Sequence, residues 1–448
     1  MLVSKPMKYP VTLALICAAI LAVHIPKQIV PEKPNWNDPK PASDIPTIFV
    51  WTEKFERNFR TPGWIAVSSN LKSEQLAPSL IGVKSGGNTA HKYPKKRFHF
   101  QFGKESSWVK SLDRNLLGMA SDDDWILDPA YRDGLLFRNQ VNKIIYSKLE
   151  EPLLLGRLVD VVWNGEYQGV YYLTQRYERK NLGLKKTNSS SPLIDYFEDL
   201  SDESRLQFAK DTDRNIVRFL TWLKSVLSRS IELDEVYYKV RLLGADFSKK
   251  SERVFERRYP KVGEIPNVSN LSELLAWVNE SKDEEFKSQI WEIFDQGRLL
   301  NYLCFLFLNS GADNVKGNYV LVKRNGKYEF LPWDLDNTFR SINYKNGKVQ
   351  AVWDKWGFDS NVLFRRLLQL KGQDLRENWM KLRTDVFSED EILKVLQSEF
   401  DQLNLSGAYD RNNKRWGLPL LPQSDELDLV KAWVKKRLSF VDKKVMEL

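Results

Sequence analysis

Four oxygen-bearing side chains in the last third of the chain have types and spacing that suit metal-dependent chemistry. Asp313 and Asn318 lie five positions apart, and Asp334 and Asp336 follow after an intervening segment. If folding gathers them, the carboxylates repel one another unless a cation lies among them. Carboxylate and amide oxygens are the ligands that Mg²⁺ and Mn²⁺ prefer. These residues therefore predict a divalent-metal site with Asn318, Asp334 and Asp336 as ligands, Asp336 being the principal one.

The segment between the two halves of this set has the pattern of a β-hairpin. Residues 319–323 and 328–331 are strand-like, and Asn325-Gly326 lies between them. Asn-Gly is the strongest short hairpin signal, because both central residues of a type I′ turn need positive φ. Counting outward from that turn places Asn318 opposite Trp333. The open end of the hairpin is thus expected to collect all four oxygen-bearing side chains.

Each of these residues also has an ordinary structural interpretation. Asp313 lies in a turn-like segment, and Asn318 could satisfy backbone groups at the start of a strand. Asp334 or Asp336 could cap the following segment or bind a structural calcium ion. Capping explains one aspartate but not two beside a third upstream. A base, an amide ligand, a hairpin and a metal-binding aspartate are the parts of protein-kinase phosphoryl transfer, so Asp313 is interpreted as the catalytic residue.

The composition is that of a folded globular protein with two or three domains. The chain has 448 residues, of which 42% are hydrophobic and 28% charged, and these fractions exclude bulk disorder. The formal net charge of +9 is spread along the chain, and no zinc-finger, RNA-recognition or helix-turn-helix pattern occurs, so no nucleic-acid partner is expected. A mildly basic surface also suits an acidic or nucleotide ligand.

Cysteine and histidine usage excludes other chemistries. Two cysteines, one of them in the N-terminal apolar run, rule out a disulfide framework in the folded part. Three scattered histidines do not form a zinc pattern. No G-x-S-x-G motif occurs and no histidine follows His99, so a Ser-His-Asp hydrolase is not supported.

The N-terminus has the pattern of an export signal rather than of a folded domain. Lys5 and Lys8 precede the apolar run 11–25, which is shorter than the roughly 17–25 residues of a membrane span. Residues 1–26 are therefore expected to be a signal peptide or an uncleaved signal anchor. The positive residues favour an N-terminus inside and the remainder outside, which predicts a membrane-anchored, periplasmic or extracellular protein. Residues 27–46, rich in proline and charge, are expected to form a tether.

The folded part divides into a strand-rich and a helical half. Residues 47–180 are rich in strand patterns, whereas residues 181–448 are mostly helical. Residues 95–102 alternate with period two, which places Lys96 on the face of three phenylalanines and Lys95 on the opposite face. An α+β fold with a strand-rich small lobe before a mainly helical large lobe is a two-lobed, kinase-like arrangement.

Several elements can be assigned by range. The Asn164-Gly165 turn predicts a second hairpin, and Asn270 with Glu273 predicts a capping box. Helical periodicity predicts helices over 131–149, 216–227, 294–308 and 425–445, and the polar run 187–191 predicts a loop.

In these motifs the chain resembles the CotH kinases, a family named for the spore-coat protein H type. The order and rough spacing fit from about Gly82 to Phe339, and the closing helix is also similar. The resemblance implies an atypical protein-kinase fold that uses ATP with Mg²⁺ or Mn²⁺ to phosphorylate Ser, Thr or Tyr hydroxyls of a protein substrate. The matching stretches are Tyr93–Phe98, Asp124–Leu127, Leu136–Asn139, Asn164–Tyr171, Asp313 with Asn318-Tyr319, and Pro332–Asp336.

The resemblance also implies a nucleotide site. Lys96 would neutralise the nucleotide phosphates, as kinases need a cation on a small-lobe strand, and Lys95 is the alternative. The alternation alone favours a solvated basic strand start for both. Arg138 would contact phosphate or form an ion pair, and the backbone at Gly86 and Gly87 would approach phosphate or simply turn.

Two departures from the family pattern leave other functions open. The family usually has an arginine before the turn at Gly86-Gly87-Asn88, and a glutamate where this chain has Gln175. These differences favour, as an alternative, a catalytically inactive nucleotide-binding or scaffold relative in the cell envelope. A carboxylate-pair glycan hydrolase is a further alternative, although its carboxylates would face each other across a substrate, ~5–10 Å apart.

Overall fold

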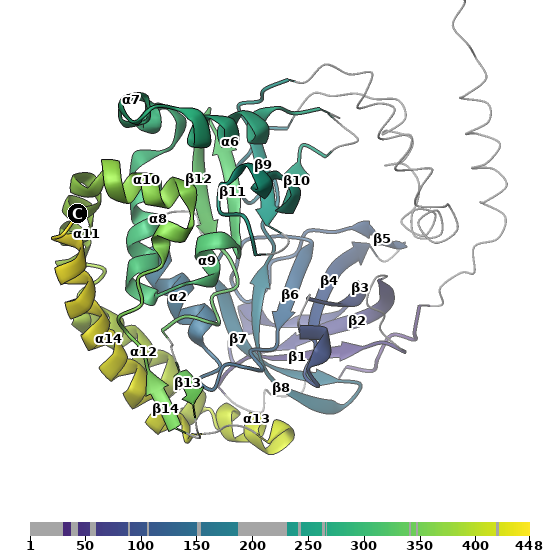
Figure 1. Cartoon of the computed structure of the whole chain (residues 1–448). Helices are drawn as coiled ribbons and strands as arrows, with labels where there is room; N and C mark the ends of the chain where they lie inside the picture. The colour runs from purple at the N-terminus through teal and green to yellow at the C-terminus, as the bar shows by residue number, and fades with distance from the viewer. Residues whose placement is uncertain are drawn as a thin grey trace, which may run out of the picture.

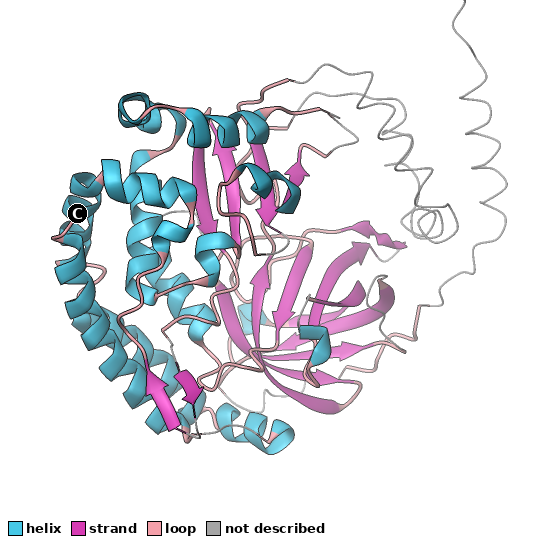
Figure 2. Cartoon of the chain, in the orientation of Figure 1, coloured by secondary structure: helices cyan, strands magenta, loops and turns pink. Residues whose placement is uncertain are grey.

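The fold is known for most of the chain after the N-terminal run. The computed structural model describes residues 30–36, 44–53, 60–87, 90–104, 107–149, 154–186, 231–240, 243–261, 265, 267–339, 342–345, 348–417 and 421–448. Within these residues the architecture is mixed, with two main sheets and a set of packed helices (Figure 1, Figure 2). The α+β class predicted above is thus confirmed.

The first half of the described chain forms an eight-stranded sheet with the order β3-β2-β1-β7-β8-β6-β4-β5. Strand β3 also pairs with β4, so the sheet closes on itself in the manner of a barrel. Neighbouring strands are antiparallel except β1 and β7, which are parallel. The strands are β1 Thr47–Trp51, β2 Thr61–Ser68, β3 Leu76–Gly86, β4 Arg97–Lys104, β5 Ser107–Ser111, β6 Asp124–Asp128, β7 Gly156–Trp163 and β8 Glu166–Gln175.

The interior of this barrel is filled by one face of each strand. Phe98, Phe100 and Phe102 alternate inward along β4, as their period-two spacing predicts, and pack with Trp125 and Tyr171. The opposite face of β4 carries polar side chains. This face is therefore the one that can contribute charge outside the barrel core.

The second half is built around a smaller sheet covered by helices (Figure 1). Its strands β9 Val236–Val240, β10 Phe255–Tyr259, β11 Tyr319–Arg324 and β12 Lys327–Pro332 are antiparallel in the order β10-β9-β11-β12. The hairpin β13 Ile342–Lys345 and β14 Lys348–Ala351 stands apart from both sheets.

A buried helix, α8, lies between this sheet and the outer helices. It spans Gln296–Asn309, and Asp295 caps it by accepting from the backbone N–H of Arg298 at 3.0 Å. The long helix α14 Gln423–Val445 curves along the outside with α11 and α12 (Figure 1). The remaining α-helices are α2 Arg138–Ser147, α6 Asn270–Glu280, α7 Asp283–Ile293, α9 Asp313–Lys316, α10 Val362–Leu370, α11 Gly372–Arg383, α12 Glu389–Leu405 and α13 Ala408–Trp416, and short 3₁₀ helices span Lys72–Glu74, Ala90–Lys92, Lys249–Val254 and Phe358–Ser360.

Most of the elements predicted by range are present. The hairpin around Asn164-Gly165 is β7–β8, and the helices predicted over 294–308 and 425–445 are α8 and α14. The hairpin around Asn325-Gly326 is β11–β12, with Arg324 paired to Lys327. The predictions over 187–191 and 216–227 lie outside the described residues, as does the apolar run 11–25.

Two local predictions were wrong in detail. The helix predicted from residue 131 begins only at Arg138, because Asp133 accepts backbone N–H groups from Leu135 and Arg138 and so holds the preceding segment in turns. Asn270 is not a helix cap: its side chain bonds both backbone groups of Leu233, and no side chain caps α6.

The start of the described chain packs against the barrel. The indole N–H of Trp64 donates to the carbonyl of Pro31 at 2.8 Å, and Trp36 lies edge-on to Phe49 and Trp51. Residues 30–36 of the predicted tether are therefore docked rather than extended into solvent. Among the described helices, none combines the length and the apolar composition that crossing a bilayer requires.

Candidate active site

The open end of the β11–β12 hairpin is set by two residues with left-handed backbone conformations. Asn318 has φ 49° and Asp334 has φ 56°, and Asn and Asp tolerate this region better than most residues. The backbone N–H of Trp333 donates to the carbonyl of Asn318 at 2.9 Å, which continues the pairing counted from the sequence. The side-chain amide of Asn318 lies 3.5 Å from the carbonyl oxygen of Asp334. Asn318 and Asp334 are therefore neighbours across the hairpin.

Buried amide side chains hold this end of the hairpin in place. The amide of Asn314 donates to the carbonyls of Asn318 at 2.7 Å and of Trp333 at 2.9 Å. From helix α2, Asn139 accepts from the backbone N–H of Leu335 at 2.6 Å. Because these amides are buried and bonded to backbone, they fix the loop that carries Asp334 and Asp336.

A second set of buried amides extends this support. The amide of Asn142, also on α2, donates to the hydroxyl of Thr338 at 2.6 Å, and Asn309 donates to Asn142 at 2.9 Å. Three segments that are far apart in sequence thus meet behind the loop.

Asp313 reaches the same loop through a neighbour of Asp336. It is the first residue of α9, and its Oδ2 accepts from the side-chain amide of Asn337 at 3.0 Å. The Asp313 side chain is half-exposed. Its free carboxylate surface is therefore accessible to a hydroxyl that approaches from solvent.

An arginine that the motif analysis did not select joins this site. Arg97, on the polar face of β4, forms ion pairs with Asp128 and, at 3.0 Å, with Asp334. Burial works against its charge, but Asp128 and Asp334 outweigh burial and raise the pKa of Arg97. Arg97 thus ties the barrel to the open end of the hairpin.

Neighbouring carboxylates disfavour the ionised form of Asp336. Burial first, and then the charges of Asp334 and Asp128, raise the pKa of Asp336 to about 7, and Arg97 only partly offsets this effect. Within the described ranges the Asp336 carboxylate forms no hydrogen bond or ion pair, and the side-chain oxygen of Asn318 accepts none. Carboxylates that repel one another, together with side-chain oxygen atoms that accept no hydrogen bond, fit a hard divalent cation such as Mg²⁺ or Mn²⁺.

The two lysines expected at the nucleotide lie away from this end of the hairpin. Lys95 is fully buried, and its ammonium group donates to the carbonyl of Val170 and, at 3.0 Å, to the side chain of Asn412 on α13. Burial lowers the pKa of Lys95 to about 7. Lys96 precedes β4 and donates to the carbonyl of His91 at 2.8 Å. In this structure both lysines bond backbone or buried side chains of their own surroundings.

Arg138 and the Gly86-Gly87 pair, the other residues predicted at the nucleotide, also contact identified residues of the protein. Arg138 is fully buried and forms ion pairs with Asp133 and, at 2.9 Å, with Glu426, so it connects α2 to α14. Gly86 ends β3 opposite Arg97, where an added Cβ would lie 2.1 Å from the His99 ring. Gly87 follows with φ +88°. Of the predicted nucleotide residues that the structure describes, Gly86 is the one paired with Arg97 across neighbouring strands.

The signal for Arg97 was present in the sequence pattern. The phenylalanine face of β4 fills the barrel core, so a cation that serves the space between the two sheets has to come from the opposite face. Arg97 and His99 alternate on that face. The same reasoning does not find Asp128, which becomes a neighbour only through the pairing of β4 with β6.

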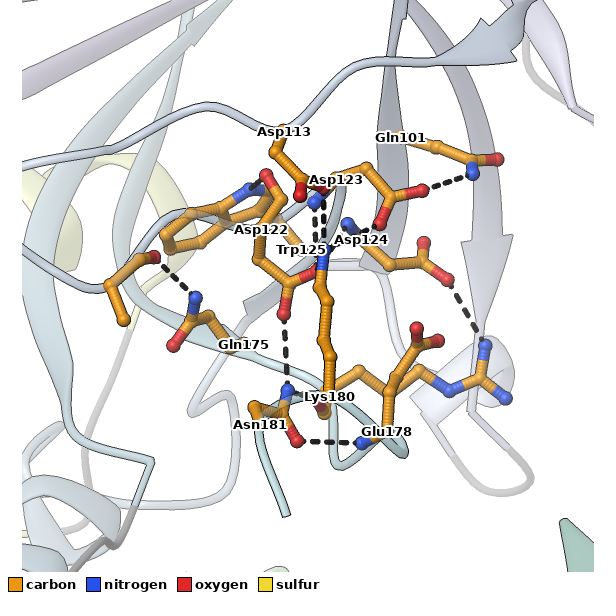
Figure 3. Close-up of polar contacts among 12 residues, drawn as sticks. Gln101, Asp113, Asp122, Asp123, Asp124, Trp125, Gln175, Glu178, Lys180 and Asn181 are labelled. Carbon is orange, nitrogen blue, oxygen red and sulfur yellow. Dashed lines mark hydrogen bonds and ion pairs between the residues drawn. The ribbon is translucent and has the colours of Figure 1, made fainter. Parts of the chain in front are cut away.

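A separate group of carboxylates lies at the far end of β6, and Figure 3 shows that a lysine already occupies it. The ammonium group of Lys180 lies 2.5 Å from Asp113, 2.9 Å from Asp122 and 3.2 Å from Asp123. We call these four residues the Lys180 cluster. The Lys180 ammonium group lies where a metal ion would have to bind among these three carboxylates, and it supplies one positive charge there. Gln175, also in Figure 3, donates to the carbonyl of Ala120 beside this cluster.

Comparison with known proteins gives the class of the chain. The family model described as CotH kinase protein matches residues 83–441. The chain therefore belongs to the CotH kinase family, as the motif resemblance predicted. It is 22% identical over 339 residues to the inner spore coat protein H of Bacillus subtilis (strain 168). The aligned region covers 74% of this chain and 76% of that protein.

Proposed function

We propose that this chain is an ATP-dependent protein kinase that transfers the γ-phosphoryl group to a Ser, Thr or Tyr hydroxyl of a protein. Membership of the CotH kinase family supports this proposal. The observation that carries it lies at the open end of the hairpin, where Asp334 and Asp128 form ion pairs with Arg97 and their charges help to raise the pKa of Asp336. Carboxylates that repel one another suit a divalent cation that in turn binds phosphates.

The proposed reaction divides among few side chains. Asp336, Asp334 and Asn318 would hold Mg²⁺ or Mn²⁺, which would screen the phosphate charge. Asp313 orients the acceptor hydroxyl and receives its proton as the oxygen–phosphorus bond forms and ADP leaves. Asn337 positions the Asp313 carboxylate through their 3.0 Å hydrogen bond. Catalysis then depends mainly on charge stabilisation and orientation, as phosphoryl transfer requires.

The proposal extends to the arrangement of lobes. Residues 47–180, which contain the barrel, act as the small lobe, and residues 181–448 act as the large lobe that carries the hairpin. The contact of Arg97 with Asp334 spans this boundary and supports a site between the lobes. Arg97, rather than Lys96 or Lys95, has the position from which a small-lobe cation can serve the phosphates. Among the described residues, the Nε atom of Arg97 has no hydrogen-bond partner, although its guanidinium group pairs with two carboxylates.

The proposed location is the cell envelope or outside the cell. The apolar run 11–25 preceded by lysines supports export, with the run acting as a signal peptide or anchor. The docked residues 30–36 would then hold the barrel close to that segment.

Labelling with γ-phosphate-labelled ATP tests the proposed reaction. The purified full chain, with Mn²⁺ or Mg²⁺, is expected to label itself or a Ser-rich acceptor peptide. Asp336→Asn should abolish labelling, and Asp313→Asn should lower the rate by about 10²- to 10⁴-fold with ATP binding unchanged. Asp410→Asn, at an exposed position on α13, is the matched control. Equal labelling by Asp336→Asn would refute the assignment, and ATP binding without any turnover would favour an inactive scaffold relative.

A further inference from the structure

Leu243 is an apolar side chain that stays exposed beside the candidate active site. It lies shortly after the end of β9 and is 62% exposed, whereas Leu321 and Leu331 of the β11–β12 hairpin are buried. Single exposed leucines are ordinary on a protein surface, so exposure alone assigns no role. What distinguishes Leu243 is its position relative to Asp313 and the way in which the backbone holds it.

Leu243 covers the C-terminal end of α9, the short helix that begins with Asp313. A Cβ atom added to Gly317, the residue after this helix, would lie 2.8 Å from Cδ2 of Leu243 and 3.4 Å from the carbonyl oxygen of Asp313. Gly317 is buried and its backbone is extended, so the absence of a side chain is what admits Leu243 at this point. Leu243 and the backbone of Asp313 therefore meet at Gly317.

Hydrogen bonds hold the segment that carries Leu243. The backbone N–H groups of Gly244 and Ala245 both donate to the carbonyl of Lys316 at 2.8 Å. The carbonyl of Ala245 in turn accepts from the hydroxyl of Tyr319, a buried residue of β11. Because the residues that follow Leu243 are fixed to α9 and β11, its side chain is presented in one place, and a ligand that packs on it pays little ordering entropy.

The carboxylate of the same segment already has partners. Asp246 Oδ1 accepts from the backbone N–H of Ser248 at 3.1 Å and from the hydroxyl of Ser251 at 2.8 Å. Burial alone would raise the pKa of Asp246, but these hydrogen bonds and the charge of Lys316 outweigh burial and lower it. Among residues 243–246, Leu243 is the exposed one, so the segment offers a ligand mainly an apolar surface.

The separation of Leu243 from the start of α9 matches the spacing of residues in a bound peptide. Helix α9 has four residues, Asp313–Lys316, so its two ends lie about 6 Å apart along the helix axis. Successive residues of an extended peptide are spaced about 3.3–3.6 Å apart. A peptide whose acceptor residue binds at Asp313 therefore brings a residue one or two positions away next to Leu243.

We propose that Leu243 selects the acceptor by packing against an apolar side chain one or two residues from the phosphorylated position, an inference that rests on the proposed kinase function. The acceptor hydroxyl lies at Asp313, which is half-exposed and held by Asn337. The apolar side chain of the acceptor then covers the surface of Leu243 that solvent reaches in the free protein. Leu243 is thus a specificity-determining residue, and the transfer step itself belongs to Asp313.

Peptide binding to the full-length protein, measured by fluorescence anisotropy with Mn²⁺ and ADP, tests the inference. Two peptides have Ala in place of the acceptor and differ only in the two residues on each side of it, which are Leu in one peptide and Asn in the other. The Leu peptide should bind about 5- to 10-fold more tightly, the effect of burying about half of one leucine side chain. Leu243→Ala should remove this preference and Leu243→Met should keep most of it. Leu405→Ala, which truncates a leucine 83% exposed on α12, is the matched control.

The same peptides with Ser at the acceptor position separate this inference from the kinase proposal. A preference for the Leu peptide that disappears in Leu243→Ala supports the inference even if the wild type transfers no phosphate to either Ser peptide. Labelling of both Ser peptides by the wild type with equal kcat/KM overturns the inference and leaves the kinase proposal standing. A preference that persists in Leu243→Ala, or binding of neither peptide, also overturns it.

Discussion

Replacing Asp336 with Asn is expected to make the metal-free protein more stable at pH 8 while removing a proposed metal ligand. Burial and the Asp334 and Asp128 carboxylates raise the pKa of Asp336 from its ordinary 3.8 to about 7. The folded state therefore binds a proton more tightly than the unfolded state between these pH values. The wild-type protein loses stability as the pH rises through this window, and the loss is complete a little above pH ~7.

The size of the effect follows from that rise in pKa. At about 1.4 kcal/mol for each tenfold change in proton affinity, the rise from 3.8 to about 7 bounds the cost of ionised Asp336 at about 4 kcal/mol. Solvent reaches part of the side chain, so about half of this bound, or about 2 kcal/mol, is expected. With an unfolding entropy of about 2.1 cal/mol/K for each of 448 residues, 1 kcal/mol corresponds to about 1 °C in melting temperature.

The assay is a thermal melt at a fixed scan rate, in EDTA, at pH 8 and pH 4.5. Asp336→Asn should melt about 2 °C above the wild type at pH 8, and the gain should fall to about a quarter of this at pH 4.5. Exposed Asp410→Asn serves as the control. A gain of equal size at both pH values, or none at pH 8, would refute the electrostatic reasoning. Added Mn²⁺ should raise the melting temperature of the wild type but not of Asp336→Asn.

Two further substitutions probe the buried charges outside the hairpin. Asn412→Leu should lower the free energy of unfolding by about 2–4 kcal/mol, because the Lys95 ammonium group and the backbone N–H of Val170 lose their shared acceptor. Lys414→Ala on the same helix is the control and should have little effect in the same melts. Lys180→Met should destabilise the metal-free protein, because three carboxylates of the Lys180 cluster lose their counter-charge. Added Ca²⁺ should then raise the melting temperature of the variant more than that of the wild type. An equal response of the two proteins to Ca²⁺ would contradict this account.

Patterns that act over a few residues were predicted well from the sequence. The Asn325-Gly326 turn fixes the register of β11 with β12, because a two-residue turn leaves one way to pair the strands, and this register brings Asn318 next to Asp334. The inward phenylalanines of β4 follow from period-two alternation in the same way. Asp295 and the apolar residues after it specify α8.

Local patterns failed where a distant segment offered a better partner. Asn270 has the spacing of a helix cap, but its amide satisfies both backbone groups of Leu233, which the sequence does not place beside it. The predicted helix over 131–149 begins too early for a related reason. Asp133 accepts backbone N–H groups and pairs with Arg138, so the residues before Arg138 form turns. Buried polar groups are stable only when they are hydrogen-bonded, so each side chain bonds the partner that the fold places within reach, whether that partner is local or distant.

The sequence by itself determined the family, through the order of its motifs. It also determined the hairpin and the position of Asn318, Asp334 and Asp336 at its open end, because these depend on short-range geometry. Only the tertiary structure decided which cations face that end. Closure of the barrel directs Arg97 toward Asp334, whereas Lys95 bonds Asn412 on a helix more than three hundred residues later. Strand pairing and helix docking choose among neighbouring charged residues, since the energy of a charge depends on its distant partners and its burial, and neither can be read from local spacing.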